Sequence, residues 1–244
     1  MGGELHLLCA GALQGLVNAL QADFERASGV PLRCRFGAVG ALREALLGGA
    51  PCDLIIVTEA MLLDLQAEGR LPAGALTPIG SVRTGVAVRV GEARPAIGSG
   101  AALKSALLAA PALYFPDPDR ATAGKHVASV LERLGIRAAM AGRVRNFPNG
   151  AASMRALADE GIAGAIGCTQ ASEILATEGV DLVGAFEGEF ELSTPYAAGL
   201  AAGAAASAAA ARLIDLLAGP ANAAARERCG IEPPLPTGRA EASA

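Results

Sequence analysis

Three short stretches of small residues constrain the fold of this chain more than any other feature. Each follows an apolar, strand-like run and opens a run with helical periodicity; they span 9–13, 36–42 and 117–124. The start of a helix exposes unpaired N–H groups and the positive end of a dipole, and small side chains let a ligand approach that backbone. We therefore predict one small anionic ligand, held from several sides by backbone N–H groups.

Short apolar runs alternate with longer amphipathic runs along most of the chain, which predicts an α/β fold with mostly parallel sheets. The alternation is interrupted by two long strand-like runs, at 81–90 and 190–200, and restarts between them. Two restarts predict two lobes, each a mostly parallel sheet flanked by helices. Lobe one is residues 1–81 plus 198–244, and lobe two is residues 82–197. The chain crosses between the lobes near 81–86 and 190–198, so the expected ligand site is the cleft between them.

Composition excludes several classes of protein. Hydrophobic residues make up 52% of the 244 residues and charged residues 18%, which excludes a disordered chain. No apolar run reaches the roughly 20 residues that a membrane span needs, so we expect no membrane insertion. The net charge is −4, the charges are interspersed and aromatic residues are only 3%, so we expect no nucleic-acid partner.

The five cysteines are widely spaced, odd in number and without a C-x-x-C pair. This usage argues against a disulfide framework or a zinc site and favours reduced thiols in a cytoplasm. Glu4 stands where a secretion signal needs a basic segment, and the apolar run from Leu5 reads as a first strand. We predict a cytoplasmic protein without metal or cofactor, or a periplasmic one whose signal has been trimmed.

The chain resembles the type II periplasmic binding-protein fold, and most closely the molybdate-binding proteins of ABC transporters, from Leu5 to about Gly230. The resemblance is carried by the stretches 9–13, 24–30, 36–42, 49–54 and 117–124. It implies a two-lobed fold whose turns hold an anion through the following small residues: Gly11, Ala12, Ala38, Val39, Gly40, Ala123 and Gly124.

Two positions depart from the pattern of the molybdate binders. The first two turns of those proteins usually each offer a serine hydroxyl to an oxyanion, and the matching positions here are Ala12 and Val39. Each charge-assisted hydrogen bond that is lost costs roughly 1.5–3 kcal/mol. We therefore expect molybdate to bind poorly, although the backbone donors remain.

Other residues favour carboxylates. Arg83 and Thr84 lie at the first crossing between the lobes, and a guanidinium matches two carboxylate oxygens. Further donors are expected at helix starts in lobe two, and these are Thr122, Asn149, Gly150, Thr169 and Gln170. This set suits a ligand with more than one carboxylate.

Some proteins similar to this family are enzymes, and aconitate isomerase is one that resembles the molybdate-binding type. The resemblance favours a cytosolic isomerase of a small unsaturated di- or tricarboxylate that acts by proton transfer without a cofactor. Candidate acid–base groups are His126, Lys125, Cys9 and Cys168, with Glu59 and Tyr196 as further possibilities. Each has a structural alternative: the cysteines are equally consistent with small buried side chains, and Lys125 or His126 with a solvent-facing or packed residue.

The rival interpretation is a non-catalytic binding protein for a carboxylate or for an oxyanion such as molybdate. It would deliver its ligand to the permease of an ABC transporter or act as a sensor. An enzyme needs a titratable group that touches the ligand, whereas a receptor needs a partner surface. The identity of the ligand and the oligomeric state do not follow from the sequence.

Overall fold

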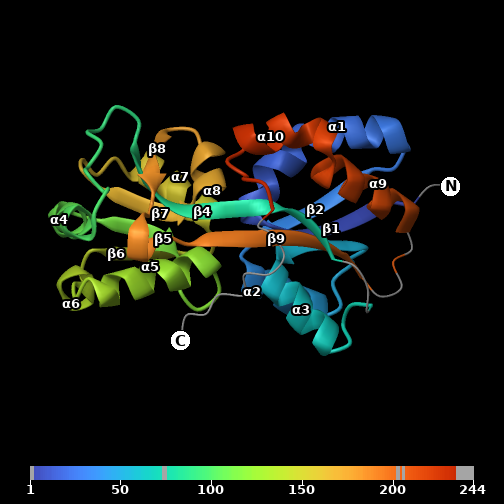
Figure 1. The fold of residues 1–244 in the computed structure, drawn as a ribbon, viewed down its shortest axis with the longest axis horizontal. Coiled ribbons are helices and arrows are strands. Elements are labelled where there is room, and N and C mark those ends of the chain that lie inside the picture. The colour runs from blue at the N-terminus through green and yellow to red at the C-terminus, as the bar shows by residue number, and fades with distance from the viewer. Residues whose placement is uncertain (1–2, 73–75, 202–203, 205–206, 235–244) are drawn as a thin grey trace.

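The computed structural model describes residues 3–72, 76–201, 204 and 207–234, and it shows a mixed sheet flanked by helices in two lobes (Figure 1). The strands are β1 (Leu5–Ala10), β2 (Leu32–Gly37), β3 (Leu54–Thr58), β4 (Thr77–Arg89), β5 (Leu113–Pro116), β6 (Val144–Phe147), β7 (Ile166–Gln170), β8 (Val180–Ala185) and β9 (Ser193–Leu200).

Helices fill the intervals between the strands. The α-helices are α1 (Gln14–Ser28), α2 (Val39–Leu47), α3 (Glu59–Ala67), α4 (Gly100–Ala109), α5 (Thr122–Arg133), α6 (Arg137–Met140), α7 (Gly150–Glu160), α8 (Ala171–Leu175), α9 (Ser207–Ala218) and α10 (Ala223–Arg228). Three short 3-10 helices are η1 (Gly11–Leu13), η2 (Gly188–Phe190) and η3 (Pro220–Asn222).

The strand order is β2-β1-β3-β9-β4-β7-β5-β6, with β8 also paired to β4. The ladders β2-β1-β3 and β7-β5-β6 are parallel, whereas every pairing of β4 and β9 is antiparallel. β4 and β9 lie side by side across the middle of the molecule and join its two halves (Figure 1). The predicted crossings at 81–86 and 190–198 fall mostly within these strands.

Separate hydrophobic cores stabilise the two lobes. The core of lobe one is built on β1 and β3, and β3 is buried along its whole length, as expected for a strand covered on both faces. The face of α1 that packs on this core consists of Leu16, Val17, Leu20 and Phe24, at helical spacing. Lobe two has its own clusters around β5, β7 and α5.

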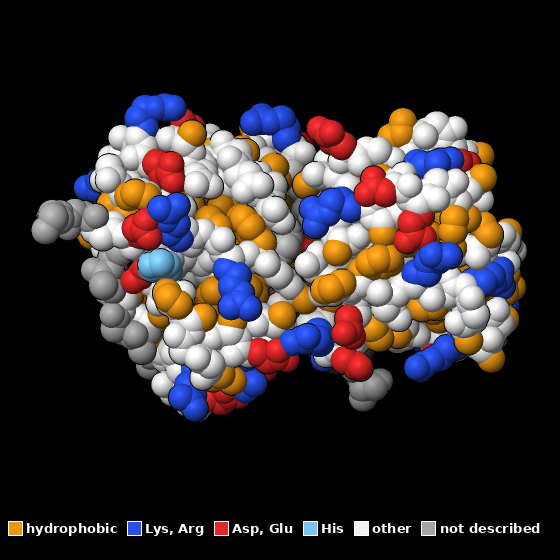
Figure 2. Space-filling view, turned by 180° about the vertical axis from the view of Figure 1, so that it is seen from behind, with side chains coloured by type: hydrophobic (Ala, Val, Ile, Leu, Met, Phe, Trp, Pro, Cys, Tyr) orange, Lys and Arg blue, Asp and Glu red, His pale blue; other side chains and the backbone are white. Residues whose placement is uncertain are grey.

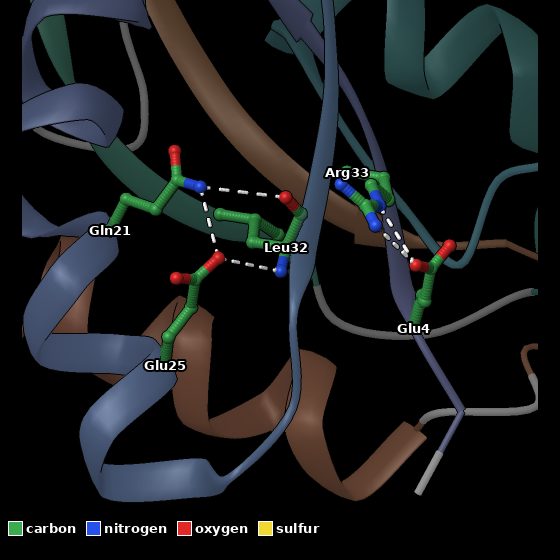
Figure 3. A network of polar contacts seen from close by, with 5 residues as sticks. All are labelled: Glu4, Gln21, Glu25, Leu32 and Arg33. Carbon is green, nitrogen blue, oxygen red and sulfur yellow. Dashed lines mark hydrogen bonds and ion pairs between the residues drawn. The ribbon is translucent and has the colours of Figure 1, made fainter.

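A polar network fixes the return from α1 into β2 (Figure 3). The Glu25 carboxylate accepts hydrogen bonds from the Leu32 backbone N–H at 2.9 Å and from the Gln21 amide at 3.0 Å. Arg33, one residue into β2, pairs with Glu4 at 2.6 Å. The register of the edge strand is therefore held at its first two residues.

The bounds of β7 and α8 differ from those that the sequence predicts. The apolar spacing of the sequence predicts a strand at 162–166 and a helix at 169–175, whereas β7 spans Ile166–Gln170 and α8 begins at Ala171. The strand starts late because Gly161 and Gly164, both with positive φ, hold 161–165 in turns after α7. Thr169 and Gln170 therefore end a strand and do not start a helix.

The C-terminal tail was expected to be loose from Glu232 onward. Instead, Glu232 forms two backbone hydrogen bonds with Ser81, at 2.8 and 3.0 Å, so this residue is tied to β4. Residues 235–244 of the predicted tail lie outside the described residues.

Among the described residues, no helix is long and apolar enough to cross a membrane. Acidic and basic side chains are interspersed over the face drawn in Figure 2, without an extended basic area.

Candidate functional site

A small pocket of about 30 Å³ lies between the lobes, where several strands end. Its wall contains residues of both lobes: Ala10, Gly11, Ala12, Gly37, Ala38, Val39, Pro116, Ala121, Thr122, Ala123, Asn149, Gly150, Gln170, Glu173 and Tyr196. The three stretches singled out in the sequence meet here, together with the start of α7. Tertiary structure thus brings residues more than 100 positions apart onto one ligand-sized wall.

Three of the helices that begin at this pocket have no side-chain cap at their first turn. The residues that precede η1, α2 and α5 are Ala10, Ala38 and Ala121, and none of them provides a side-chain cap. The start of α7, which also lies at the pocket, is capped by Asn149, whose Oδ1 accepts a hydrogen bond from the Ala152 N–H. Because an uncapped start leaves its first N–H groups without a side-chain partner, three sets of donors remain for an anion.

Glu173 is the functional residue that the sequence analysis missed. Its side chain is buried in the pocket wall, and its Oε2 accepts a hydrogen bond from the Thr169 hydroxyl at 2.6 Å. Burial raises the pKa of the Glu173 carboxyl above its ordinary value, although hydrogen bonds from Thr169 and from backbone N–H groups of Ala151, Gln170 and Gly150 oppose the rise. The raised pKa makes the protonated carboxyl more favourable here than at an exposed glutamate.

Two glycines make room for this carboxyl group. A Cβ atom at Gly150 would lie 1.9 Å from Glu173 Oε2, and one at Gly11 would lie 2.5 Å from Oε1. Any larger residue at either position would overlap the carboxylate. The glycines were predicted as ligand contacts; in the structure they also seat Glu173.

Tyr196 and Gln170 complete the polar part of the wall. Burial raises the pKa of the Tyr196 hydroxyl, and the nearby charges of Glu173 and Cys9 raise it further, so the phenol stays protonated. Gln170 donates its amide N–H to Thr194 at 3.2 Å, and no described residue donates to its amide oxygen. The pocket therefore offers a hydroxyl donor and an unused acceptor beside Glu173.

The residues predicted at the first crossing do not line the pocket. Arg83 forms an ion pair with Glu232, with 2.9 Å between Nε and Oε1, and remains about half exposed. Thr84 is buried opposite Gln170 in the sheet, and its hydroxyl has no hydrogen-bond partner among the described residues. The ion pair with Glu232 thus holds the Arg83 guanidinium against the C-terminal segment, away from the pocket wall.

Of the predicted acid–base residues, Tyr196 lines the pocket, whereas Lys125, His126, Cys9 and Cys168 lie off its wall. Lys125 is exposed, while His126 Nε2 contacts the Phe190 carbonyl oxygen at 2.8 Å and its ring meets Phe186 edge-on. Cys9 and Cys168 are buried, and burial raises the pKa of both thiols, which disfavours the reactive thiolate. These four side chains pack within the lobes or face solvent.

The remaining predicted glycines serve close packing. A Cβ at Gly124 would lie 2.3 Å from the Pro116 carbonyl oxygen, so this glycine lets α5 approach the end of β5. The Gly40 N–H donates to the Arg120 carbonyl oxygen at 3.1 Å, a hydrogen bond that crosses from lobe one to lobe two. Arg120 also pairs with Glu44 of lobe one. The two contacts of Arg120, with Gly40 and with Glu44, join the lobes across the cleft, and we call them the interlobe latch.

The architecture and the pocket at its strand ends agree with a comparison against protein-family models. Residues 5–232 match the model described as bacterial extracellular solute-binding protein. The chain belongs to this family. The type II periplasmic binding fold expected from the sequence is therefore confirmed.

Individual relatives span the whole fold. The chain is 26% identical over 235 residues to an aconitate isomerase from Pseudomonas sp, which covers 94% of this chain and 87% of that protein. The periplasmic molybdate-binding protein of Azotobacter vinelandii superposes with a TM-score of 0.77 at 18% identity, covering 95% and 100% of the two chains. The sulfate-binding protein of Mycobacterium tuberculosis H37Rv gives 0.70 at 18% identity, covering 96% and 87%.

Proposed function

We propose that the protein is an isomerase of a small unsaturated di- or tricarboxylate, and that Glu173 moves the proton. The observation that carries the proposal is a buried carboxyl of raised pKa in the wall of an anion pocket. A simple receptor for an anion has no need of a buried carboxyl in its wall, whereas an enzyme that shifts a proton needs such a group beside its substrate. The 26% identity to an aconitate isomerase supports the same reading.

The proposed binding groups are the backbone donors of both lobes. A carboxylate of the substrate accepts hydrogen bonds from the starts of η1, α2 and α5, through the segments 11–12, 38–39 and 122–123. Asn149, Gly150 and Gln170 face the same space from lobe two. The closed lobes exclude water and strengthen these interactions.

The proposed reaction is an allylic proton shift. The ionised Glu173 takes a proton from the methylene carbon next to a bound carboxylate, the electron pair spreads over the three-carbon unit, and the double bond moves. Glu173 then returns the proton to the carbon at the far end, so that no atom is gained or lost. The protonated Tyr196 hydroxyl donates a hydrogen bond to the developing negative charge.

The test is turnover of unsaturated acids by the purified protein. Incubation with trans-aconitate in D₂O is expected to produce the cis isomer, as measured by proton NMR, and deuterium enters the receiving carbon only to the extent that the Glu173 carboxyl exchanges with solvent before it returns the proton. A panel of other unsaturated di- and tricarboxylates tests the substrate range. Binding of these acids without any isomerisation or deuterium exchange would contradict the proposal.

The second candidate is a receptor for a small oxyanion or carboxylate, and the uncapped helix starts favour it. The relatives named for molybdate and sulfate binding share the fold. Because Ala12 and Val39 offer no hydroxyl, we expect molybdate to bind weakly even if this function holds, and micromolar binding by calorimetry would contradict that expectation. Under this alternative an ABC transporter permease is the partner. The cytoplasmic location remains a prediction, since the family is described as extracellular.

A further inference from the structure

A second hollow adjoins the pocket on the far side of Glu173. This groove has a volume of about 220 Å³ and lies between α1 of lobe one and α7 and α8 of lobe two. Gly11 and Glu173 belong to the walls of both hollows. The carboxyl of Glu173 thus stands at the boundary between a small pocket and a larger groove.

The groove carries groups that suit a carboxylate. Arg155 on α7 lines it, and its guanidinium forms no ion pair with any described residue. Gln14 and Asn18 on α1 and Thr177 after α8 add neutral polar side chains. An unpaired guanidinium flanked by neutral donors matches the planar, two-oxygen geometry of a carboxylate. Glu178, which is exposed, is the acidic residue of the wall besides Glu173.

The small volume of the pocket suggests that a substrate occupies both hollows. A pocket of about 30 Å³ has room for one group of a few atoms, whereas clefts that bind whole small molecules typically measure roughly 300 Å³ or more. The groove supplies most of the missing space once the contact between Glu173 and Gly11, which separates the two hollows, opens.

Glu173 lies between the two hollows, where one proton-carrying group can reach both ends of a substrate. An allylic proton shift removes a proton at one end of a three-carbon unit and returns it at the other, so the group that carries the proton must reach both ends. A base between two carboxylate subsites meets this requirement, because the terminal carboxylates then flank the reacting carbons.

We propose that the groove at Arg155 is a second carboxylate subsite, which selects acids long enough to extend from the pocket past Glu173. The inference rests on the proposed carboxylate site but not on turnover. A substrate anchors one terminal carboxylate on the backbone donors of the pocket and the other on Arg155. Acids whose two carboxylates lie too close together engage only the first subsite.

Calorimetric binding of two inert acids tests the subsite. Tricarballylate has the five-carbon chain of aconitate without its double bond, and malonate is too short to span both hollows. We expect Arg155→Gln to weaken tricarballylate by about tenfold or more and to leave malonate unchanged, since a charged hydrogen bond contributes roughly 1.5–3 kcal/mol. Arg212→Gln, at an exposed position on α9, is the matched control and should change neither.

Glu178→Gln provides a test of opposite sign. Removing this negative charge should tighten tricarballylate binding, which a merely structural role of the groove does not predict. The proposal is overturned if Arg155→Gln leaves tricarballylate affinity intact, if it weakens both acids equally, or if the unmodified protein binds tricarballylate no better than malonate. A protein that binds in this pattern but never isomerises trans-aconitate would refute the proposed enzyme and leave the subsite standing.

Discussion

The two walls of the pocket are built from different chemistry. Lobe one contributes small residues whose backbone N–H groups lie at uncapped helix starts, at 11–12 and 38–39. Lobe two contributes side chains with their own chemistry, above all Glu173, Gln170 and Asn149. One wall is suited to hold an anion of any kind, because backbone donors do not discriminate by pKa. The other wall can discriminate between ligands and can exchange a proton.

This difference separates the part of the site that the fold supplies from the part that individual side chains supply. The backbone wall depends on strand and helix geometry, which any sequence of small residues preserves. A single buried carboxyl on the opposite wall changes what the site can do. The glycines at 11 and 150 link the two, since each leaves the space that the Glu173 carboxyl occupies.

Removing the Glu173 carboxyl from the lobe-two wall should have the largest effect and tests the difference between the two walls most directly. Glu173→Gln keeps the size of the side chain and one acceptor oxygen, but it cannot exchange a proton. We expect turnover of the unsaturated acid to fall by about 10²–10⁴-fold, while binding of tricarballylate stays or improves. Glu227→Gln, at an exposed position on α10, should have no effect. Equal turnover in the variant would exclude Glu173 as the base.

Filling the space beside the carboxyl should have the next largest effect. Gly150→Ala places a methyl group 1.9 Å from Glu173 Oε2, so the carboxyl or the start of α7 must shift. We expect a loss of roughly 1–3 kcal/mol in the free energy of unfolding and at least tenfold weaker ligand binding. Chemical denaturation and calorimetry measure the two changes. Gly142→Ala, where a Cβ meets nothing within 4 Å, is the control that should behave like the original protein.

The pH dependence of stability should distinguish the two walls, because only the lobe-two wall titrates. Burial raises the pKa of Glu173 above 4.5, so the folded state favours the neutral carboxyl. Stability from this preference is complete below pH 4.5 and is lost as the pH rises through the raised pKa. Glu173→Gln should therefore gain stability relative to the original protein over that window, as measured by urea unfolding at a series of pH values. A constant difference would mean that the carboxyl titrates normally.

The interlobe latch should give the smallest effect, because its ion pair is exposed. Glu44→Gln removes the partner of Arg120 but leaves the hydrogen bond from the Gly40 N–H to the Arg120 carbonyl. Exposed ion pairs contribute at most about 1 kcal/mol, so ligand release should accelerate by no more than roughly fivefold. Stopped-flow release at low and high salt measures it, and the difference should shrink as salt rises. A far larger acceleration would make the latch a main determinant of closure.

Part of this site was predictable from the chain alone. The three stretches 9–13, 36–42 and 117–124 all reach the pocket, since strand ends and helix starts follow from local periodicity. Glu173 was missed because the prediction placed residues 169–175 on one helix, where a glutamate normally faces solvent. The break between β7 and α8 at Ala171 instead directs its side chain toward α7. No local pattern marks such a break.

Sequence alone determined the α/β alternation, the two restarts of the pattern and the helix starts that meet at the pocket. These features depend on apolar spacing and on residues with small side chains. Tertiary structure decided which side chains meet. It paired Arg83 with Glu232, tied His126 to the Phe190 carbonyl, and placed Glu173 between Gly11 and Gly150. The reason is that burial and charge, which set the pKa of a carboxyl, arise from neighbours far away in the chain.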